Sequence, residues 1–368
     1  MLLTPARALL MTSIFALMAY GQPPEFTSPV VTDDGTATFR YHAPAASSVA
    51  VQGLRGREPV AMAKDKDGIW SATVTGLPPD LYSYTFTVDG AVTLDPRNRN
   101  LKKWIRSESA FEVAGTPAAD FVVQDVPHGV VHRHTYASAA AGRAMSYHVY
   151  TPPGYNPMSS TRYPVVFLFH GFGDDETAWE ENGRAHAIAD NLIARGAMQK
   201  AIIVMPHGHP VPYPLTPDEE FWRKNDPAME RAVLDELLPR IAREYRVSTK
   251  AKDRAIVGLS MGGGHALGIG LKHPRLFGWV GGFSSASPET DLDTRFADVV
   301  AAAAKKKPTP FLWIAIGKDD FLLERNQAFN TWLEAKHIPF TYRLTDGGHE
   351  WTVWRQYLGE FLQQIFKD

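Results

Sequence analysis

The chain contains no cysteine in 368 residues. This absence excludes disulfide bonds, thiolate nucleophiles, zinc sites built from thiolates and a lipid-modified N-terminal cysteine. An excess of charge of one sign is lacking as well, because 38 Lys and Arg residues are balanced by 40 Asp and Glu residues. A net charge of -2 gives no electrostatic reason to expect nucleic acid or an anionic membrane as a partner. A neutral or weakly charged substrate fits this composition better.

The first 21 residues have the composition of a leader. Arg7 precedes an apolar run from Ala8 to Tyr20, which is too short to span a bilayer comfortably, and small residues occupy Ala19 and Gly21. This pattern predicts a signal peptide over residues 1–21, with an ordinary N-terminal helix as the alternative. We therefore expect a secreted or periplasmic protein with no stable membrane association after export.

The length favours two domains, and the sequence pattern changes near residue 117. Residues 22–116 contain short runs that alternate polar and apolar residues, with Asp89-Gly90 between two of them, as is typical of hairpins in an all-β unit. We predict a small β-sandwich there. Its linker to the next domain is expected between Val113 and Val122, where Gly and Pro interrupt the pattern.

Residues 117–368 alternate strand-like and helix-like segments. The apolar runs suited to strands buried on both faces are 165–169, 201–205, 254–257, 279–283 and 311–316. Helical periodicity marks residues 229–245 and 263–272. This alternation predicts a mostly parallel, doubly wound sheet, which is an α/β fold.

The strongest chemical motif is Gly258-Leu259-Ser260-Met261-Gly262, between an apolar strand and a helix. This context predicts a nucleophile elbow of the α/β-hydrolase fold, in which the serine hydroxyl is exposed at the N-terminus of a helix. A glycine-rich turn with an incidental serine is the alternative. Ser260 is therefore our candidate nucleophile.

A serine hydroxyl needs an oriented base, and α/β-hydrolases place the acid and then the histidine after the serine. Of the 13 histidines, His349 follows a β-like run within a glycine loop, so we select it as the base. The candidate acids are Asp319 and Asp320, which follow the strand-like run 311–316. We expect Asp346 to be a turn residue, and we expect neither a metal nor a cofactor.

An oxyanion hole needs two N–H donors. The Met261 N–H is one candidate, because it follows the nucleophile. The turn His170-Gly171-Phe172-Gly173 supplies the other, for which we select the Phe172 N–H. His170 precedes the nucleophile in the chain, so we expect it to make a structural hydrogen bond beneath this loop.

Residues 125–366 resemble the bacterial esterases of carbohydrate esterase family 1, the esterase D group. The stretches that carry the resemblance are 150–155, 170–173, 245–248, 258–263, 281–284, 317–321 and 348–351 with Trp354. The resemblance implies an α/β-hydrolase fold, places the acid at Asp320, and implies release of ferulic acid or acetyl groups from plant xylan. The N-terminal unit, through Leu81–Gly90 and Leu94–Asn98, resembles the immunoglobulin-like modules related to carbohydrate-binding module family 48.

Three hypotheses of function follow. The first is hydrolysis of a small-molecule ester or of a feruloylated or acetylated polysaccharide. The second is a siderophore trilactone esterase, and the third is a glycan-binding protein without catalysis. For an apolar acyl site, the candidate residues are Trp179, Trp222 and Trp351.

Overall fold

The computed structural model describes residues 24–367, which divide into two compact units. The first unit comprises the described residues up to Leu101 together with Glu108–Ala114, and the second comprises Lys102–Ser107 and the chain from Gly115 onward. The predicted signal peptide, residues 1–21, lies outside the described residues. Within residues 24–367, no helix combines the length and the apolar character that crossing a membrane requires.

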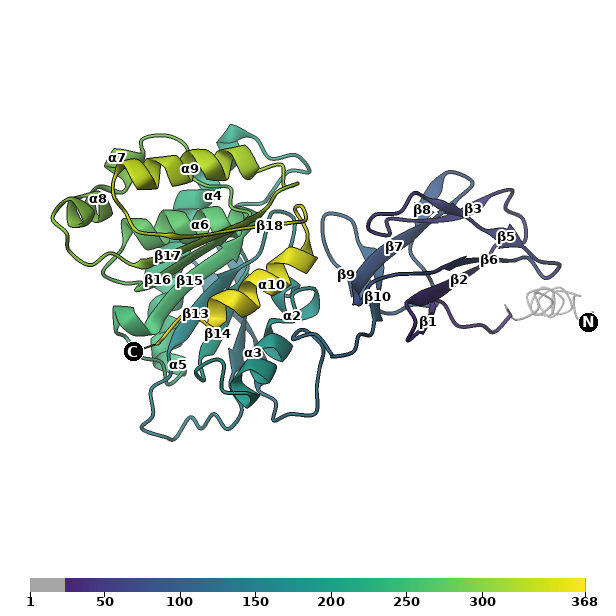
Figure 1. Ribbon diagram of the computed structural model, residues 1–368, viewed down its shortest axis with the longest axis horizontal. Helices are drawn as coiled ribbons and strands as arrows, with labels where there is room; N and C mark the ends of the chain where they lie inside the picture. The colour runs from purple at the N-terminus through teal and green to yellow at the C-terminus, as the bar shows by residue number, and fades with distance from the viewer. Residues whose placement is uncertain (1–23, 368) are drawn as a thin grey trace, which may run out of the picture. The chain divides into compact units, whose positions relative to one another are not determined.

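The first unit is built on two β-sheets (Figure 1). One sheet has the strand order β1-β2-β6-β5, and the other has the order β4-β3-β7-β10-β9, with β8 paired to β7. The strands are β1 (Val30–Thr32), β2 (Thr36–His42), β3 (Val49–Gln52), β4 (Val60–Ala61), β5 (Ala63–Lys64), β6 (Ile69–Val74), β7 (Asp80–Val88), β8 (Ala91–Thr93), β9 (Leu101–Lys102) and β10 (Glu108–Val113).

One apolar core belongs to both of these sheets. Phe39 of β2 and Tyr84 of β7 are fully buried in it, and their rings meet edge to face at 4.8 Å. Trp70 and Tyr82 are also core residues, with 7% and 4% of their surface exposed. The unit therefore has the mostly β character that the alternating sequence predicted, and Asp89-Gly90 turns between β7 and β8 with positive φ at both residues.

The second unit contains an eight-stranded sheet with the order β11-β12-β14-β13-β15-β16-β17-β18. The strands from β14 to β18 along this order are parallel, whereas β11 and β12 are antiparallel to their neighbours. The strands are β11 (Val130–Ser138), β12 (Arg143–Thr151), β13 (Val165–Phe169), β14 (Ile202–Pro206), β15 (Arg254–Leu259), β16 (Trp279–Phe283), β17 (Phe311–Gly317) and β18 (Thr341–Thr345). The five predicted strand runs correspond to β13 through β17.

Helices cover both faces of this sheet (Figure 1). The helical segments are α2 (Ala178–Glu181), α3 (Ala185–Ala194), α4 (Glu219–Arg231), the π-helical η2 (Ala232–Leu237), α5 (Leu238–Glu244), the 3-10 segment η3 (Ala251–Asp253), α6 (Ser260–Lys272), α7 (Leu292–Arg295), α8 (Ala297–Ala304), α9 (Leu323–Ala335) and α10 (Trp351–Leu362). Along β13, Val165, Phe167 and Phe169 belong to the apolar core that also includes residues of α4, α6 and α9, whereas Val166 and Leu168 belong to the core that includes residues of α3 and α10. A strand with an apolar layer on each side must be apolar throughout, which explains the unbroken run.

Two helices begin earlier than the sequence predicted. The helix predicted over 229–245 begins at Glu219, because the Asp218 side chain caps it by accepting a hydrogen bond from the Phe221 N–H at 2.8 Å. The helix predicted over 263–272 begins at Ser260 itself. The second difference places the candidate nucleophile at the N-terminus of α6.

A substitution at Phe167 tests the packing between the sheet and the helices on one of its faces. The Phe167 side chain is fully buried and lies edge to face with Phe277 at 6.4 Å. We expect Phe167→Ala to lower the free energy of unfolding by about 3–5 kcal/mol, because it removes buried apolar surface and leaves a cavity. The measurement is urea denaturation followed by circular dichroism. Met158→Ala, at a side chain that is 84% exposed, is the control, and equal losses in the two variants would contradict this packing.

Candidate active site

Ser260 stands at a sharp turn between β15 and α6. Leu259 still has extended backbone angles, whereas Ser260 has φ of +73°, a conformation that side-chain-bearing residues rarely adopt. The turn is held by close packing of its flanking glycines. A Cβ on Gly258 would lie 2.5 Å from the backbone of Gly262, and a Cβ on Gly262 would lie 2.4 Å from the His170 carbonyl oxygen. A side chain at either Gly258 or Gly262 would thus clash with neighbouring backbone, so both positions require glycine.

The structure brings Ser260, His349 and Asp320 together in that order. The Oγ of Ser260 lies 3.0 Å from Nε2 of His349, and Nδ1 of His349 lies 3.0 and 3.1 Å from the two carboxylate oxygens of Asp320. An ionised carboxylate only accepts hydrogen bonds, so the His349 proton is on Nδ1. Nε2 is then free to accept the proton of the serine hydroxyl.

Asp320 is buried, with 4% of its surface exposed. Burial alone would raise the pKa of its carboxyl, but hydrogen bonds from His349, Ser284 and the Leu322 N–H outweigh burial and hold that pKa below its ordinary value. Asp319 is exposed, and the exposed Asp346 pairs with Lys318 at 2.9 Å. Within the described part of the chain, Asp320 is the carboxyl of these three that hydrogen bonds His349.

Two residues near the triad had been given no role from the sequence. Ser284 follows β16, accepts a hydrogen bond from the Trp354 indole at 3.0 Å, and hydrogen bonds Asp320. Phe321 is 76% exposed and its ring lies 4.5 Å from the His349 ring. Ser284 belongs to the matched stretch 281–284 and Phe321 to the matched stretch 317–321, and this resemblance was the available signal for both.

The loop that carries Phe172 is fixed to a second loop by two histidines. His170 Nδ1 donates to the Gly171 carbonyl at 2.8 Å, and its Nε2 accepts from the Gly208 N–H at 2.7 Å. His209 Nε2 accepts from the Gly173 N–H at 3.3 Å. These bonds hold the peptides on both sides of Phe172.

Both histidines stay neutral, as acceptors must. Burial lowers the pKa of His170 to about 3, and burial also lowers the pKa of His209. Together with His207 they form a cluster, found among the described residues, whose ring nitrogens lie within 4.8 Å and could offer ligands to a metal ion. Both nitrogens of His170 and Nε2 of His209 already bond the backbone, so the cluster as it stands is a structural one.

Phe172 and Met261 flank Ser260 from two sides. A Cβ on Gly171 would lie 3.4 Å from the Ser260 Cβ, so the Phe172 loop is packed against the start of α6. The Met261 N–H is in the first turn of α6, where N–H groups have no acceptor within the helix. The Trp104 indole, from the Lys102–Ser107 segment of the same compact unit, donates to the Phe172 carbonyl at 2.9 Å.

The three candidate tryptophans have different environments. Trp222 lies 5.8 Å from the Phe172 ring, and Trp351 lies 5.3 Å from Trp354, whose ring is 4.9 Å from His349. Trp179 is only 1% exposed, and its indole N–H donates to the Phe169 carbonyl at 2.9 Å. Trp179 is therefore a core residue in this structure, and we drop it from the substrate-contacting set.

Comparison with known proteins places this architecture in a family. The sequence model of the family described as "Putative esterase" matches residues 138–365. An endo-1,4-beta-xylanase/feruloyl esterase of Xylanibacter ruminicola is 34% identical over 355 residues, which are 92% of this chain and 46% of that protein. This chain thus spans about half the length of that relative.

Two solved structures share the fold. A CE1 ferulic acid esterase from Anaeromyces mucronatus, in complex with ferulic acid, matches with a TM-score of 0.59 and 23% identity over 67% of this chain and 94% of that one. The enterobactin esterase from Shigella flexneri matches with a TM-score of 0.63 and 18% identity over 92% of this chain and 96% of that one.

The chain belongs to this esterase family, whose solved neighbours are α/β-hydrolases. The family model and the xylanase/feruloyl esterase relative support a carboxylic ester hydrolase. These matches give no support to the hypothesis of a glycan-binding protein without catalysis.

Glu176 is predicted to make the stability of the folded protein depend on pH in the acid range. It accepts a hydrogen bond from Ser146 of β12 at 2.5 Å and lies 3.0 Å from Nδ1 of His207. Burial alone would raise the pKa of Glu176, but these contacts hold it at about 2. A depressed folded pKa stabilises the protein above the ordinary value of 4.5, and this contribution is lost as pH falls towards 2.

We therefore expect Glu176→Gln to be less stable than the wild type near neutral pH by about 1–3 kcal/mol, less than the full pKa shift implies because the carboxyl is partly exposed. The difference should shrink as pH falls below 4.5. Urea titrations of both proteins at several pH values measure it. A stability difference that stays constant with pH would show that the carboxylate charge does not matter.

Proposed function

We propose that this protein is a secreted serine esterase that releases ferulic acid, or acetyl groups, from plant xylan through Ser260, His349 and Asp320. The hydrogen-bonded sequence from Ser260 Oγ to His349 to Asp320 is the observation that carries the mechanism. The 34% identity to a xylanase/feruloyl esterase over 92% of this chain supports the substrate class.

The proposed reaction has two steps. His349 Nε2 takes the Ser260 proton as Oγ bonds the ester carbonyl carbon, and the imidazolium then returns that proton to the leaving alcohol as the ester C–O bond breaks. His349 next takes a proton from a water whose oxygen bonds the acyl carbon; the bond from that carbon to Ser260 Oγ then breaks, Oγ takes the proton from His349, and the acid leaves. Asp320 stabilises the imidazolium, and the Phe172 and Met261 N–H groups stabilise the oxyanion.

The surroundings of Phe172 support an ester substrate with an aromatic acyl group. The Phe172 ring is in contact with four others, which belong to His209, Tyr213, Phe221 and Trp222, at centroid distances of 5.3 to 5.8 Å. Apolar walls with a few fixed polar groups are typical of small-molecule sites. We keep Trp222 and Trp351 as substrate-contacting residues.

For the N-terminal part we propose residues 1–21 as a signal peptide, 22–116 as an immunoglobulin-like module related to carbohydrate-binding module family 48, and 117–368 as the hydrolase domain. The polymer substrate is consistent with such a module. No step of the chemistry depends on it.

The enterobactin esterase fold supports a second candidate, hydrolysis of a siderophore trilactone, because that structural match covers 92% of this chain. At 18% identity this match supports a shared fold and does not support a shared substrate. Sequence identity to the xylanase/feruloyl esterase over the same span makes xylan esters our first choice.

One panel tests both the nucleophile and the substrate. We expect wild type to hydrolyse methyl ferulate or acetylated xylan faster than a catechol trilactone, and Ser260→Ala to lose at least about a thousandfold in kcat on each. Product release followed by liquid chromatography is the measurement. Equal turnover by Ser260→Ala would remove Ser260 as nucleophile, and preference for the trilactone would favour the second candidate.

A pair of neighbouring variants tests the acid. Asp320→Asn should reduce kcat by about 10³- to 10⁴-fold, because it removes the charge that fixes the His349 tautomer. Asp319→Asn is the matched control and should retain activity, since the Asp319 side chain is exposed. Similar losses in both variants would contradict the assignment of Asp320.

A further inference from the structure

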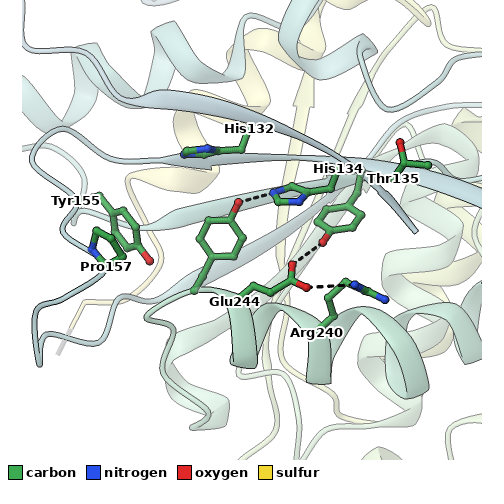
Figure 2. Close-up of a pocket in the computed structure, with 9 residues that line it drawn as sticks. His132, His134, Thr135, Tyr155, Pro157, Arg240 and Glu244 are labelled. Atoms are coloured by element: carbon green, nitrogen blue, oxygen red, sulfur yellow. Dashed lines mark hydrogen bonds and ion pairs between the residues drawn. The ribbon is translucent and has the colours of Figure 1, made fainter. Parts of the chain in front are cut away.

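A cavity of about 470 Å³ opens on the sheet edge that lies away from the proposed triad. Figure 2 shows its walls, which come from β11, β12, the loop after β12, and α5 with the residue that follows it. The volume falls within the range of ligand pockets, about 300–1,000 Å³. Nothing in the proposed reaction uses this cavity.

The cavity is separate from Ser260. Strand β11 lies four positions from β15 in the sheet order, and neighbouring strands are about 4.8 Å apart, so the two are about 19 Å apart across the sheet. A small ligand in this cavity therefore cannot also be the ester that Ser260 attacks. Only a polymer long enough to span this distance could occupy both positions. Any occupant of the cavity is thus a second binding event.

The charges in the cavity are paired. Arg240 Nη1 lies 3.1 Å from Glu244 Oε1, and the Tyr147 hydroxyl donates to Glu244 Oε2 at 2.9 Å, as the dashed lines in Figure 2 mark. Burial lowers the pKa of His134, so this imidazole is neutral at neutral pH. The lining favours a ligand without charge.

Two imidazoles on one face of β11, those of His132 and His134, present ring nitrogens to the cavity. Among the described residues the Tyr245 hydroxyl has no other hydrogen-bond acceptor than His134 Nε2, at 2.5 Å, so it donates there and His134 keeps its proton on Nδ1. The Thr151 hydroxyl donates to the Val130 carbonyl at 3.3 Å and therefore accepts from His132 Nε2 at 3.1 Å. The Nδ1 atom of His132 bonds no protein group among the described residues.

His132 and His134 are two positions apart on a strand, so both side chains point to the same side. His134 offers an N–H at Nδ1, and His132 offers its own Nδ1. Aromatic surface lies beside them: the His134 ring stacks on Tyr147 at 4.8 Å, and Tyr155 and Tyr245 have ring centroids 6.3 Å apart. Tyr147 and Tyr245 are almost fully buried, so the ring surface open to a ligand comes from Tyr155 and the two imidazoles, beside their Nδ1 atoms.

We propose that this cavity binds a neutral pyranose unit. A pyranose has a C–H face that packs on aromatic rings and adjacent hydroxyls that each donate and accept, which matches the lining just described. The proposal of a sugar ligand rests on the lining of the cavity alone. The choice of the xylan backbone as the source of the sugar rests on the proposed function.

The test uses the full chain and unsubstituted xylotetraose, which has no ester bond to hydrolyse. Binding is measured by calorimetry and by the shifts of the histidine Cε1–H proton resonances. His132→Phe and His134→Phe keep a flat ring and remove the hydrogen-bonding nitrogens, and His337→Phe is the matched control at an exposed histidine. Each cavity variant should bind at least about tenfold more weakly, while the control binds as the wild type does.

Turnover of methyl ferulate, measured on the same proteins, separates this proposal from the proposed function. Unchanged turnover in the cavity variants shows that they are folded. Equal xylotetraose binding by wild type and both cavity variants, or no binding by wild type, would overturn the sugar site. Tighter binding of maltotetraose than of xylotetraose would overturn xylan as the source. Loss of ester turnover in Ser260→Ala leaves the sugar site intact and bears on the nucleophile alone.

Discussion

The parallel pairing of β15, β16, β17 and β18 is the constraint on which the proposed site depends. The carboxyl ends of these strands lie on the same side of the sheet, and one residue of the proposed site follows each of them. Ser260 follows β15, Ser284 follows β16, Asp320 follows β17 and His349 follows β18. At about 4.8 Å per strand, the serine and the acid are two steps apart, roughly 10 Å, which one imidazole can bridge. The register of the sheet thus sets the spacing that the chemistry needs.

Close packing of backbone fixes the remaining parts. Gly258 and Gly262 let β15, α6 and the His170 loop approach each other so closely that a methyl group would clash. His170 and His209 then bond peptides on either side of Phe172. The proposed oxyanion donor at Phe172 is therefore positioned by two histidines outside the Ser260–His349–Asp320 hydrogen bonds, which would keep it oriented before the charge develops.

Much of this could be predicted from the sequence, and the reason is local. The runs 165–169 and 279–283 coincide with β13 and β16 because a strand buried on both faces needs an unbroken apolar sequence. The turn around Ser260 and the loop of His349 were marked by glycines. Asp320 could be separated from Asp319 only by resemblance, because the two carboxyls are adjacent and only the fold decides which one is buried.

Other features depend on contacts between distant segments and left no local pattern. Trp179 looked like a pocket residue, yet it is buried because its indole bonds the end of β13. The helix start at Glu219 depends on one capping aspartate, and the Lys102–Ser107 segment joins the second unit instead of the sandwich in which it lies in sequence. The cavity beside β11 likewise combines residues more than 100 positions apart, such as His134 and Tyr245.

The most direct test of the account is covalent capture of the nucleophile. An alkyl fluorophosphonate reacts with a serine only where a base activates it and donors hold the developing oxyanion. Peptide mass spectrometry of the treated protein should find the phosphonyl group on Ser260, with loss of esterase activity in proportion to labelling. A fully labelled protein that carries the group on another serine, or full inhibition without label on Ser260, would contradict the account.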